Sequence, residues 1–217
     1  MQNIDDCKDI IPFNIRVNVD KENMNSVGEL WPEVIKRKWH EKLHVAPAAV
    51  GSYNEQCGLA AEACLSGEEF AQVCKEQLTC FYEAGVKIPA QLLIPAKRKL
   101  YCTAVGYGSF VVDPDGYLYT CWNVIGRKEK SVGNIVQGNP MNVEFMKWLL
   151  HEPAESCQTC NLLPICSGGC PYFFFEGGKA VCDNVKFTFH DNLKLLHKIY
   201  CDEKGNSQSK IAGEHSV

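Results

Sequence analysis

The stretch from Cys157 to Cys182 reads CQTCNLLPICSGGCPYFFFEGGKAVC and contains five cysteines within 26 residues. The chain as a whole has 13 cysteines among 217 residues, which is well above ordinary usage. Cysteines at such short spacings hold disulfides, a zinc ion or iron–sulfur clusters, and each of these implies a different fold and function. The rest of the sequence helps to distinguish these three possibilities.

Composition and charge are those of an ordinary globular protein of the cytosol. Hydrophobic residues make up 46% and charged residues 22%, and the net charge of −4 comes without a long basic run, so we expect no nucleic-acid binding through charge. No apolar stretch approaches the roughly 18–20 residues of a membrane span, and the N-terminal MQNIDDCKDI lacks the apolar region of a secretory signal. We therefore expect a cytoplasmic protein without membrane contact. Its thiols are kept reduced, so clustered cysteines indicate metal ligation.

The first hundred residues begin with a strand pattern followed by a helix pattern. In residues 11–19, IPFNIRVNV, apolar residues recur at every second position from Phe13 to Val19, which predicts a strand. The second half of residues 20–42 has apolar residues at helical spacing, with Pro32 in the first turn of the predicted helix.

The same alternation continues to residue 95. Residues 43–50 form a short apolar run that predicts a second strand. Ser66 and Glu69 form a capping box at the start of a predicted helix that ends at Gly85, and residues 87–95 predict a third strand. Strand, helix, strand, helix, strand implies parallel βα units and an α/β fold.

The pattern changes near residue 100. Residues 109–122, SFVVDPDGYLYTCW, are two alternating runs around a DPDG turn and predict a β-hairpin. A short helix is predicted over 139–152, with Asn139 as its cap and Pro140 at its first position, and a C-terminal helix over 189–200.

These patterns divide the chain into three predicted segments. Residues 1–100 form the α/β segment, and residues 101–190 form a small cysteine-rich domain with a hairpin and short helices. Residues 191–217 hold the end of the last helix and a frayed polar tail.

Four of the clustered cysteines have the spacing C-x2-C-x5-C-x3-C. They are Cys157, Cys160, Cys166 and Cys170. In C-x2-C two thiolates of one turn reach the same metal centre, and four thiolates bind zinc tetrahedrally, although the x5 and x3 intervals are short for four sulfurs around one ion. Cys170 precedes Pro171, as does the last cysteine of the run in bacterial ferredoxins, where it ligates a second cluster. We therefore expect Cys170 to point away from its neighbours. Cys182 downstream and the hairpin cysteines Cys102 and Cys121 upstream then become candidate ligands.

These cysteine spacings resemble those of the SPASM domain, which is the C-terminal domain of many radical S-adenosylmethionine enzymes. That family's pattern is C-x9–15-G-x4-C, a gap, C-x2-C-x5-C-x3-C, a second gap and a final cysteine. Here Cys102 is followed by thirteen residues, then by Gly116, then by YLYT and Cys121. Cys182 takes the final position, and VGNI at residues 132–135 is also similar to the family.

In the best-described relatives this domain binds two [4Fe–4S] clusters. The resemblance implies one cluster on Cys157, Cys160, Cys166 and Cys182. It implies a second cluster on Cys102, Cys121 and Cys170. No cysteine lies between Cys102 and Cys121, so the second cluster has an open iron or takes a ligand from elsewhere, with Cys80 as a distant donor.

The first hundred residues are similar to the second half of the partial (βα)6 barrel of the same superfamily. The resemblance makes residues 11–23 the fourth strand and its turn, and 44–50 and 91–95 the fifth and sixth strands. The motif C-x3-C-x2-C, whose cluster cleaves S-adenosylmethionine, is absent from these 217 residues. The resemblance therefore implies half a barrel followed by a SPASM domain. We expect a fragment or split half of a radical enzyme that modifies a peptide or protein. It is not catalytic alone, and S-adenosylmethionine binds only in a complete enzyme.

The implied partners are a peptide or protein substrate, an electron donor and the missing half of the barrel. The clusters of such a protein transfer electrons or anchor substrate at an open iron. Two alternatives stay open: a standalone ferredoxin-like electron-transfer module and a structural zinc-binding protein. The remaining cysteines are interpreted as ordinary thiols. They are Cys7, Cys57, Cys64, Cys74, Cys80 and Cys201.

Overall fold

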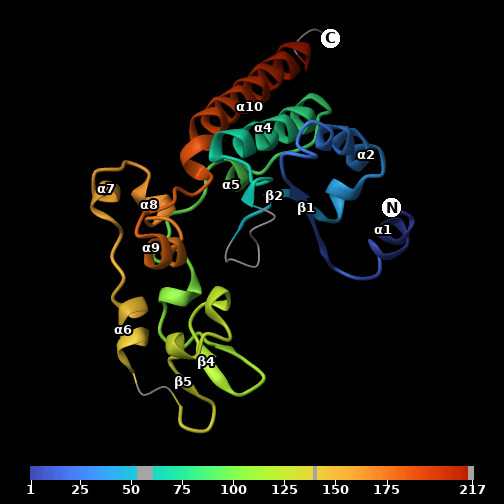
Figure 1. The fold of residues 1–217 in the computed structure, drawn as a ribbon. Coiled ribbons are helices and arrows are strands. Elements are labelled where there is room, and N and C mark those ends of the chain that lie inside the picture. The colour runs from blue at the N-terminus through green and yellow to red at the C-terminus, as the bar shows by residue number, and fades with distance from the viewer. Residues whose placement is uncertain (53–60, 139–140, 215–217) are drawn as a thin grey trace. The chain divides into compact units, whose positions relative to one another are not determined.

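The structure is a computed structural model that describes residues 1–52, 61–138 and 141–214, with side chains as far as residue 204. The fold is mixed α/β with small sheets (Figure 1). The chain divides into two compact units: Met1–Pro95 with Phe187–Val217 form the first, and Ala96–Lys186 form the second. In the described ranges, no helix is both long and apolar enough to cross a membrane.

The first unit is built on a two-stranded parallel sheet. β1 (Asn14–Val19) pairs with β2 (His44–Ala49) in a register that aligns Ile15 with Val45. The alternation predicted for the first strand is confirmed, because exposure alternates along β1 and Val19 at its end is fully buried. The core of this unit consists of Val19, Val27, Trp31, Val34, Trp39, Leu43, Val45 and Val73.

The helix α4 (Gly67–Glu83) begins and ends as the sequence predicts. The Glu69 N–H donates to Ser66 Oγ at 3.1 Å, and the Ser66 N–H donates to Glu69 Oε2 at 2.7 Å, which completes the capping box. Gly85 follows the helix with a φ of +73°. The buried Gln77 donates its Nε2 to the Val45 carbonyl at 2.8 Å, so a side chain of α4 also bonds to the backbone of β2.

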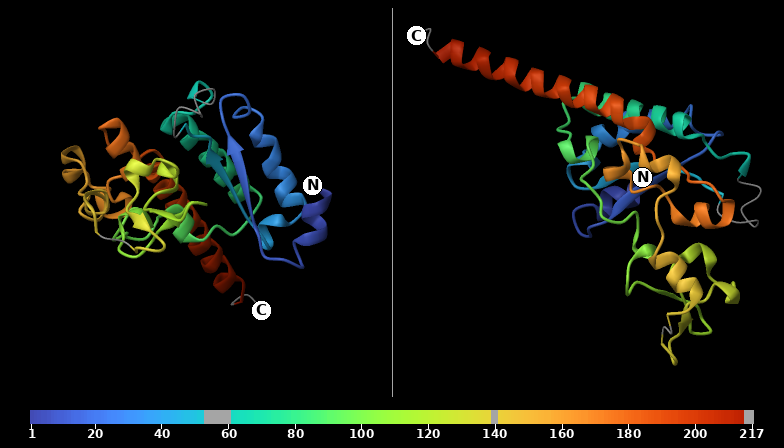
Figure 2. Two further views of the ribbon diagram at one scale, coloured as in Figure 1. Left: turned by 60° about the horizontal axis from the view of Figure 1, so that its bottom comes forward. Right: turned by 90° about the vertical axis from the view of Figure 1, so that its left-hand side faces the viewer.

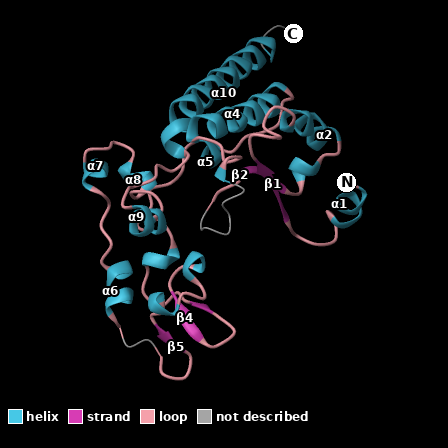
Figure 3. Ribbon diagram, in the orientation of Figure 1, coloured by secondary structure: helices cyan, strands magenta, loops and turns pink. Residues whose placement is uncertain are grey.

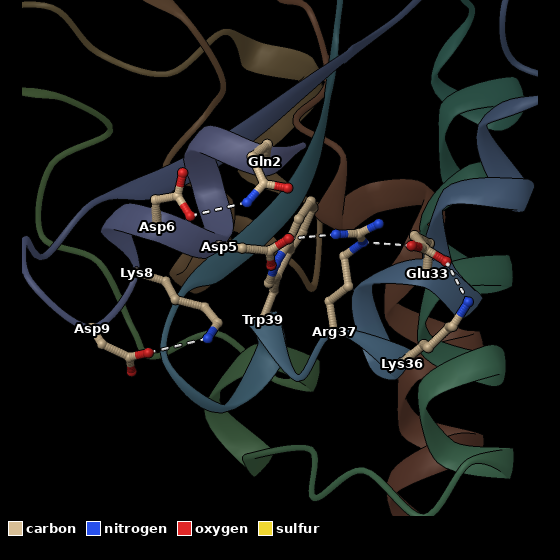
Figure 4. A network of polar contacts seen from close by, with 9 residues as sticks. All are labelled: Gln2, Asp5, Asp6, Lys8, Asp9, Glu33, Lys36, Arg37 and Trp39. Atoms are coloured by element: carbon tan, nitrogen blue, oxygen red, sulfur yellow. Dashed lines mark hydrogen bonds and ion pairs between the residues drawn. The ribbon is translucent and has the colours of Figure 1, made fainter.

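Polar contacts attach the N-terminal helix α1 (Gln2–Cys7) to the rest of its unit (Figure 4). Trp39 Nε1 donates to Asp5 Oδ1 at 2.7 Å, and Arg37 pairs with both Asp5 and Glu33. The hydrogen bond from Trp39 is the largest cause that lowers the pKa of Asp5, and Arg37 lowers it further. The sequence analysis does not predict α1, because a six-residue helix without a buried side chain carries no apolar periodicity.

The strand predicted over residues 87–95 is wrong. This segment contains a short helix, α5 (Ala90–Leu93), and within the described residues the sheet of the first unit has the strands β1 and β2. Pro89 precedes the helix with a φ of −63°, and alanine, glutamine and leucine all favour helix over strand. Leu93 is fully buried, so this segment packs through one apolar side chain of a helix where a strand was expected.

The C-terminal helix α10 (Val185–Glu214) is longer than the predicted helix at 189–200. Residues 202–214 continue the helix in place of the expected frayed tail; this stretch contains no proline that would interrupt the backbone hydrogen bonds. α10 lies beside α4 (Figures 1 and 2), where Phe187 fills the space left by Gly67. A Cβ on Gly67 would lie 2.1 Å from the Phe187 ring, and Lys75 pairs with Asp191 at 3.1 Å.

The second unit contains the predicted hairpin, whose strands are short (Figure 3). β3 (Val111–Val112) pairs antiparallel with β4 (Tyr117–Tyr119), and Gly116 has the positive φ of +82° that the turn requires. Asp113 Oδ1 accepts the N–H of Tyr117 at 2.9 Å and so closes the turn. A third strand, β5 (Gly133–Asn134), pairs with β4; two residues are too few to show alternation in the sequence.

The helix predicted over 139–152 is present but starts later. α6 spans Val143–Leu149, and its cap is Asn142, whose Oδ1 accepts the Phe145 N–H at 2.9 Å. The predicted cap Asn139 and first residue Pro140 lie outside the described residues.

The remaining elements that the structure describes, in residues 1–52, 61–138 and 141–214, are short. The other α-helices are α2 (Leu30–Lys36, with Pro32 in its first turn as predicted), α7 (Glu155–Gln158), α8 (Leu163–Cys166) and α9 (Pro171–Gly177). The single-turn 3-10 helices are η1 (Val27–Glu29), η2 (Trp39–Glu41), η4 (Thr103–Val105), η5 (Trp122–Val124) and η6 (Lys128–Lys130).

Candidate metal centre

Four cysteines of the second unit line one small cavity of about 30 Å³, the four-cysteine cavity. They are Cys157, Cys160, Cys166 and Cys182. The other lining residues are Leu162, Leu163, Gly168, Ala180, Val181 and Lys186. Thiols are therefore the main metal-binding groups of the cavity, and most of the other lining side chains are apolar.

Consecutive tight turns bring three of these cysteines together. The Cys160 N–H donates to the Cys157 carbonyl at 3.0 Å, and the Leu163 N–H donates to the Cys160 carbonyl at 3.0 Å. The Cys166 N–H then donates to the Leu162 carbonyl at 2.9 Å, at the end of α8. Each turn reverses the chain within a few residues, so Cys157, Cys160 and Cys166 all reach the same cavity.

Three left-handed residues then redirect the chain. Ser167, Gly168 and Gly169 have φ angles of +56°, +86° and +82°. A Cβ on Gly169 would lie 2.1 Å from the carbonyl oxygen of Val181, so only glycine permits this close approach. The approach brings the segment of Cys182 to the cavity, and the turn leads to Cys170, which is not among the residues that line the cavity.

The other three predicted ligands, Cys102, Cys121 and Cys170, share a different environment. They are partly buried and pack against an apolar cluster that contains Tyr119 and Trp148. Each of the three occupies the N-cap position of a short helix: Cys102 of η4, Cys121 of η5 and Cys170 of α9.

The electrostatic interactions between the cysteine thiols fall into the same two groups. Burial raises the pKa of Cys121, and negative charge on Cys170 and Cys102 raises it further. Burial likewise raises the pKa of Cys182. The positive charge of Lys186 lowers this pKa, whereas negative charge on Cys166, Cys157 and Cys160 raises it further. Cys121 and Cys182 thus each interact with members of their own group, and thiolates gathered in this way need a cation to stay charged.

The donor set fits a thiolate-ligated metal group, because it consists of sulfur alone within apolar surroundings. Among the described residues, however, no three His, Cys, Asp or Glu side chains converge closely enough to hold a single metal ion. The ligand assignment from the sequence therefore remains a prediction.

The sequence analysis missed an ionic link between the two segments that carry Cys121 and Cys170. Arg127 follows η5, and its Nη1 pairs with Glu176 of α9 at 2.7 Å. In the described part of the chain, its Nε and Nη2 are buried without a hydrogen-bond partner. The two charged residues are 49 positions apart, and no local pattern links them.

The cysteines interpreted as ordinary thiols lie in the first unit, apart from Cys57, which is outside the described residues. Within the described ranges, no two cysteines form a disulfide. Burial raises the pKa of Cys74 to about 11. Cys80, the distant donor considered for the second group, lies in α4 and packs against the core of its own unit.

Comparison with known proteins gives a likeness of fold. No family model and no curated protein matches the chain. Among solved structures, it resembles native anSMEcpe with bound AdoMet, with a TM-score of 0.55, 19% identity, and coverage of 86% of this chain and 58% of that one. anSMEcpe is a radical S-adenosylmethionine enzyme with a SPASM domain that matures sulfatases anaerobically.

Two further structures of the same protein give similar values. Native anSMEcpe with bound AdoMet and Kp18Cys peptide has a TM-score of 0.56 at 18% identity, over 86% of this chain and 58% of that one. A histidine-tagged form of anSMEcpe with bound AdoMet has the same TM-score and identity over 86% and 55%. The chain therefore spans little more than half the length of these relatives, and it shares part of their fold.

Proposed function

We propose that this chain is an iron–sulfur protein of the SPASM type, with two [4Fe–4S] clusters in its second unit. One cluster would be held by Cys157, Cys160, Cys166 and Cys182. The other would be held by Cys102, Cys121 and Cys170. The observation that carries the proposal is the division of the cysteines: four line one cavity, and the other three cap short helices on a separate apolar cluster.

The fold likeness supports a role in radical modification of a peptide. One relative was solved with AdoMet and the Kp18Cys peptide together. The cluster that cleaves S-adenosylmethionine needs C-x3-C-x2-C, which these 217 residues do not contain. We infer that the first unit is the second half of a radical enzyme barrel and that radical chemistry requires a polypeptide carrying that motif.

When bound, the clusters would supply electron transfer, and an iron with three protein ligands would offer a position for substrate. The residues of this chain would set the conditions for that chemistry. Leu162, Leu163 and Val181 would shield the first cluster from water, and the positive charge of Arg127 would offset thiolate charge near Cys121.

Anaerobic reconstitution with iron and sulfide tests the proposal. We expect a brown protein with broad absorbance near 400 nm and roughly eight irons per chain, because each cluster contains four. A colourless protein that retains one zinc ion would favour the structural zinc alternative instead. Mixing the reconstituted protein with a polypeptide that carries C-x3-C-x2-C should then give reductive cleavage of S-adenosylmethionine, which this chain alone should not give.

A further inference from the structure

The second unit contains a hollow of about 320 Å³, which we name the basic pocket. Its lining includes three consecutive cations, Lys97, Arg98 and Lys99, and the aromatic side chains of Tyr101 and His151. Its volume lies at the lower end of the roughly 300–1,000 Å³ typical of small-ligand sites, so it suits one or two side chains rather than a flat protein surface.

The charge of the basic pocket is opposite to that of the whole chain. Three consecutive cations, Lys97, Arg98 and Lys99, line the pocket, and none of its described lining residues is acidic. The chain has a net charge of −4. Lys97 and Lys99 are exposed and form no ion pair within the described residues, so their charges are available to a ligand.

Arg98 is anchored between these two lysines. Its backbone N–H donates to the Pro164 carbonyl at 2.9 Å, and its Nη1 pairs with Asp183 Oδ2 at 3.4 Å. Pro164 belongs to α8, which carries Cys166, and Asp183 follows Cys182. The basic wall of the pocket is therefore attached to both segments that meet at the four-cysteine cavity.

The other walls are apolar or uncharged at neutral pH. Leu100, Val105 and Leu163 provide aliphatic surface. Burial lowers the pKa of His151, so its imidazole favours the neutral form. A ligand that fits this lining combines a carboxylate for the lysines with a neighbouring aliphatic group.

We propose that the basic pocket binds an acidic side chain of a peptide, flanked by an aliphatic residue. The preference for an anion follows from the lining residues, whereas the choice of a peptide rests on the proposed function. A bound peptide would lie next to Tyr101 and Ser167, the sequence neighbours of Cys102 and Cys166.

Peptide binding to the reconstituted full chain tests this proposal. The probes are the fluorescein-labelled pentapeptide GLELG and its twin GLQLG, both amidated at the C-terminus, which differ only in the side-chain charge. In anisotropy titrations at about 20 mM salt, we expect the glutamate peptide to bind at least about tenfold more tightly. The advantage should shrink strongly at about 200 mM salt, because salt screens exposed charges. Equal affinities for the two peptides would overturn the proposal, as would binding confined to an acidic folded protein.

A pair of double variants locates the site. Lys97→Glu with Lys99→Glu should abolish the preference for the glutamate peptide. Lys87→Glu with Lys179→Glu makes the same change in net charge at exposed lysines that do not line the pocket, and should leave the preference intact. Equal loss in both double variants would show a general charge effect and contradict the assignment.

Iron content is measured on the same samples. A preparation that takes up no iron but prefers the glutamate peptide refutes the proposed function and retains the pocket. A preparation with full iron and no preference retains the proposed function and refutes the pocket.

Discussion

The core of the first unit and residues 151–168 of the second unit, which we call the cysteine segment, are ordered in different ways. In the first unit, Trp31, Val34 and Val19 are at most 1% exposed, and helices and strands meet around them. In the second, no residue from 151 to 168 is buried, and neither α7 nor α8 contains a buried side chain. Apolar burial accounts for the first region, whereas the cysteine segment needs another source of order.

The contrast lies between segments and not simply between units. The hairpin part of the second unit has its own buried side chains, among them Tyr119, Val132 and Phe145. Cys102 and Cys121 lie in that better-packed part, whereas Cys157, Cys160 and Cys166 lie in the segment without a core. We infer that ligation of a cofactor orders the cysteine segment, because the free energy of ligation adds to that of folding.

Removal of iron should have the largest effect on hydrogen exchange, and this effect should differ between the two regions. Treatment of the reconstituted protein with an iron chelator is expected to remove the hydrogen-exchange protection of residues 151–168, none of which is buried. Protection of α4 in the first unit should be retained, since its contacts are apolar. Mass spectrometry of peptides from both regions measures the difference. Equal protection of residues 151–168 with and without iron would contradict the inference.

Truncation of Trp31 should produce the opposite pattern. Trp31→Ala removes a side chain that is 1% exposed, and we expect a loss of about 3–5 kcal/mol in the stability of the first unit with unchanged iron content. Urea unfolding followed by circular dichroism, together with iron analysis, measures both. The matched control is Trp122→Ala, whose side chain is 74% exposed and whose loss should change stability by about 0.5 kcal/mol or less.

Gly169→Ala should affect the cysteine segment through geometry alone. The added Cβ would combine a positive φ of +82° with a contact of 2.1 Å to the Val181 carbonyl, so the segment of Cys182 must move away. We expect a cost of about 1–3 kcal/mol from the backbone conformation, and loss of roughly four irons. Gly178→Ala is the control, because Gly178 has a similar φ of +68° and no atom within 4 Å of its Cβ position. If both variants lose the same iron, the close approach at Gly169 is unimportant.

The smallest effect is expected at α1 and depends on pH. The pKa of Asp5 is lowered in the folded state, so its contacts stabilise the attachment of α1 above the ordinary carboxyl pKa of about 4 and are lost as the pH falls below it. Asp5→Asn should therefore increase hydrogen exchange of α1 at pH 7, and the difference from the natural chain should shrink as the pH falls through the lowered pKa of Asp5. Asp6→Asn, which removes the carboxylate that accepts a bond from Gln2, is the control and should change exchange little.

Elements with a periodic pattern or a cap could be predicted from the sequence. β1 and α4 follow from alternation and a capping box, and the hairpin follows from its DPDG turn. α5 could not, because the five residues AQLLI between Pro89 and Pro95 are too few to show a period that separates helix from strand. The length of α10 was likewise missed, since composition alone suggested a tail.

The candidate site was predictable in its residues and less so in its surroundings. Cysteine spacing singles out the ligands, because metal ligation imposes short fixed intervals. The basic pocket has no such signature. Lys97 and Lys99 look like an ordinary exposed charge run, and His151 joins them only because the chain folds back over about fifty residues. The contact between Arg127 and Glu176 could not be predicted either, because the two residues are 49 positions apart in the sequence.

Iron analysis of cysteine variants tests the two-cluster assignment most directly. After anaerobic reconstitution, the natural chain should bind about eight irons. Cys166→Ala and Cys170→Ala should each retain about four, although the two residues are neighbours in sequence. Cys166→Ala combined with Cys182→Ala should also retain about four, because both belong to one cluster, whereas Cys166→Ala with Cys170→Ala should retain almost none. If the Cys166 and Cys170 double variant still binds about four irons, Cys170 belongs to the same cluster as its neighbours and the assignment is wrong.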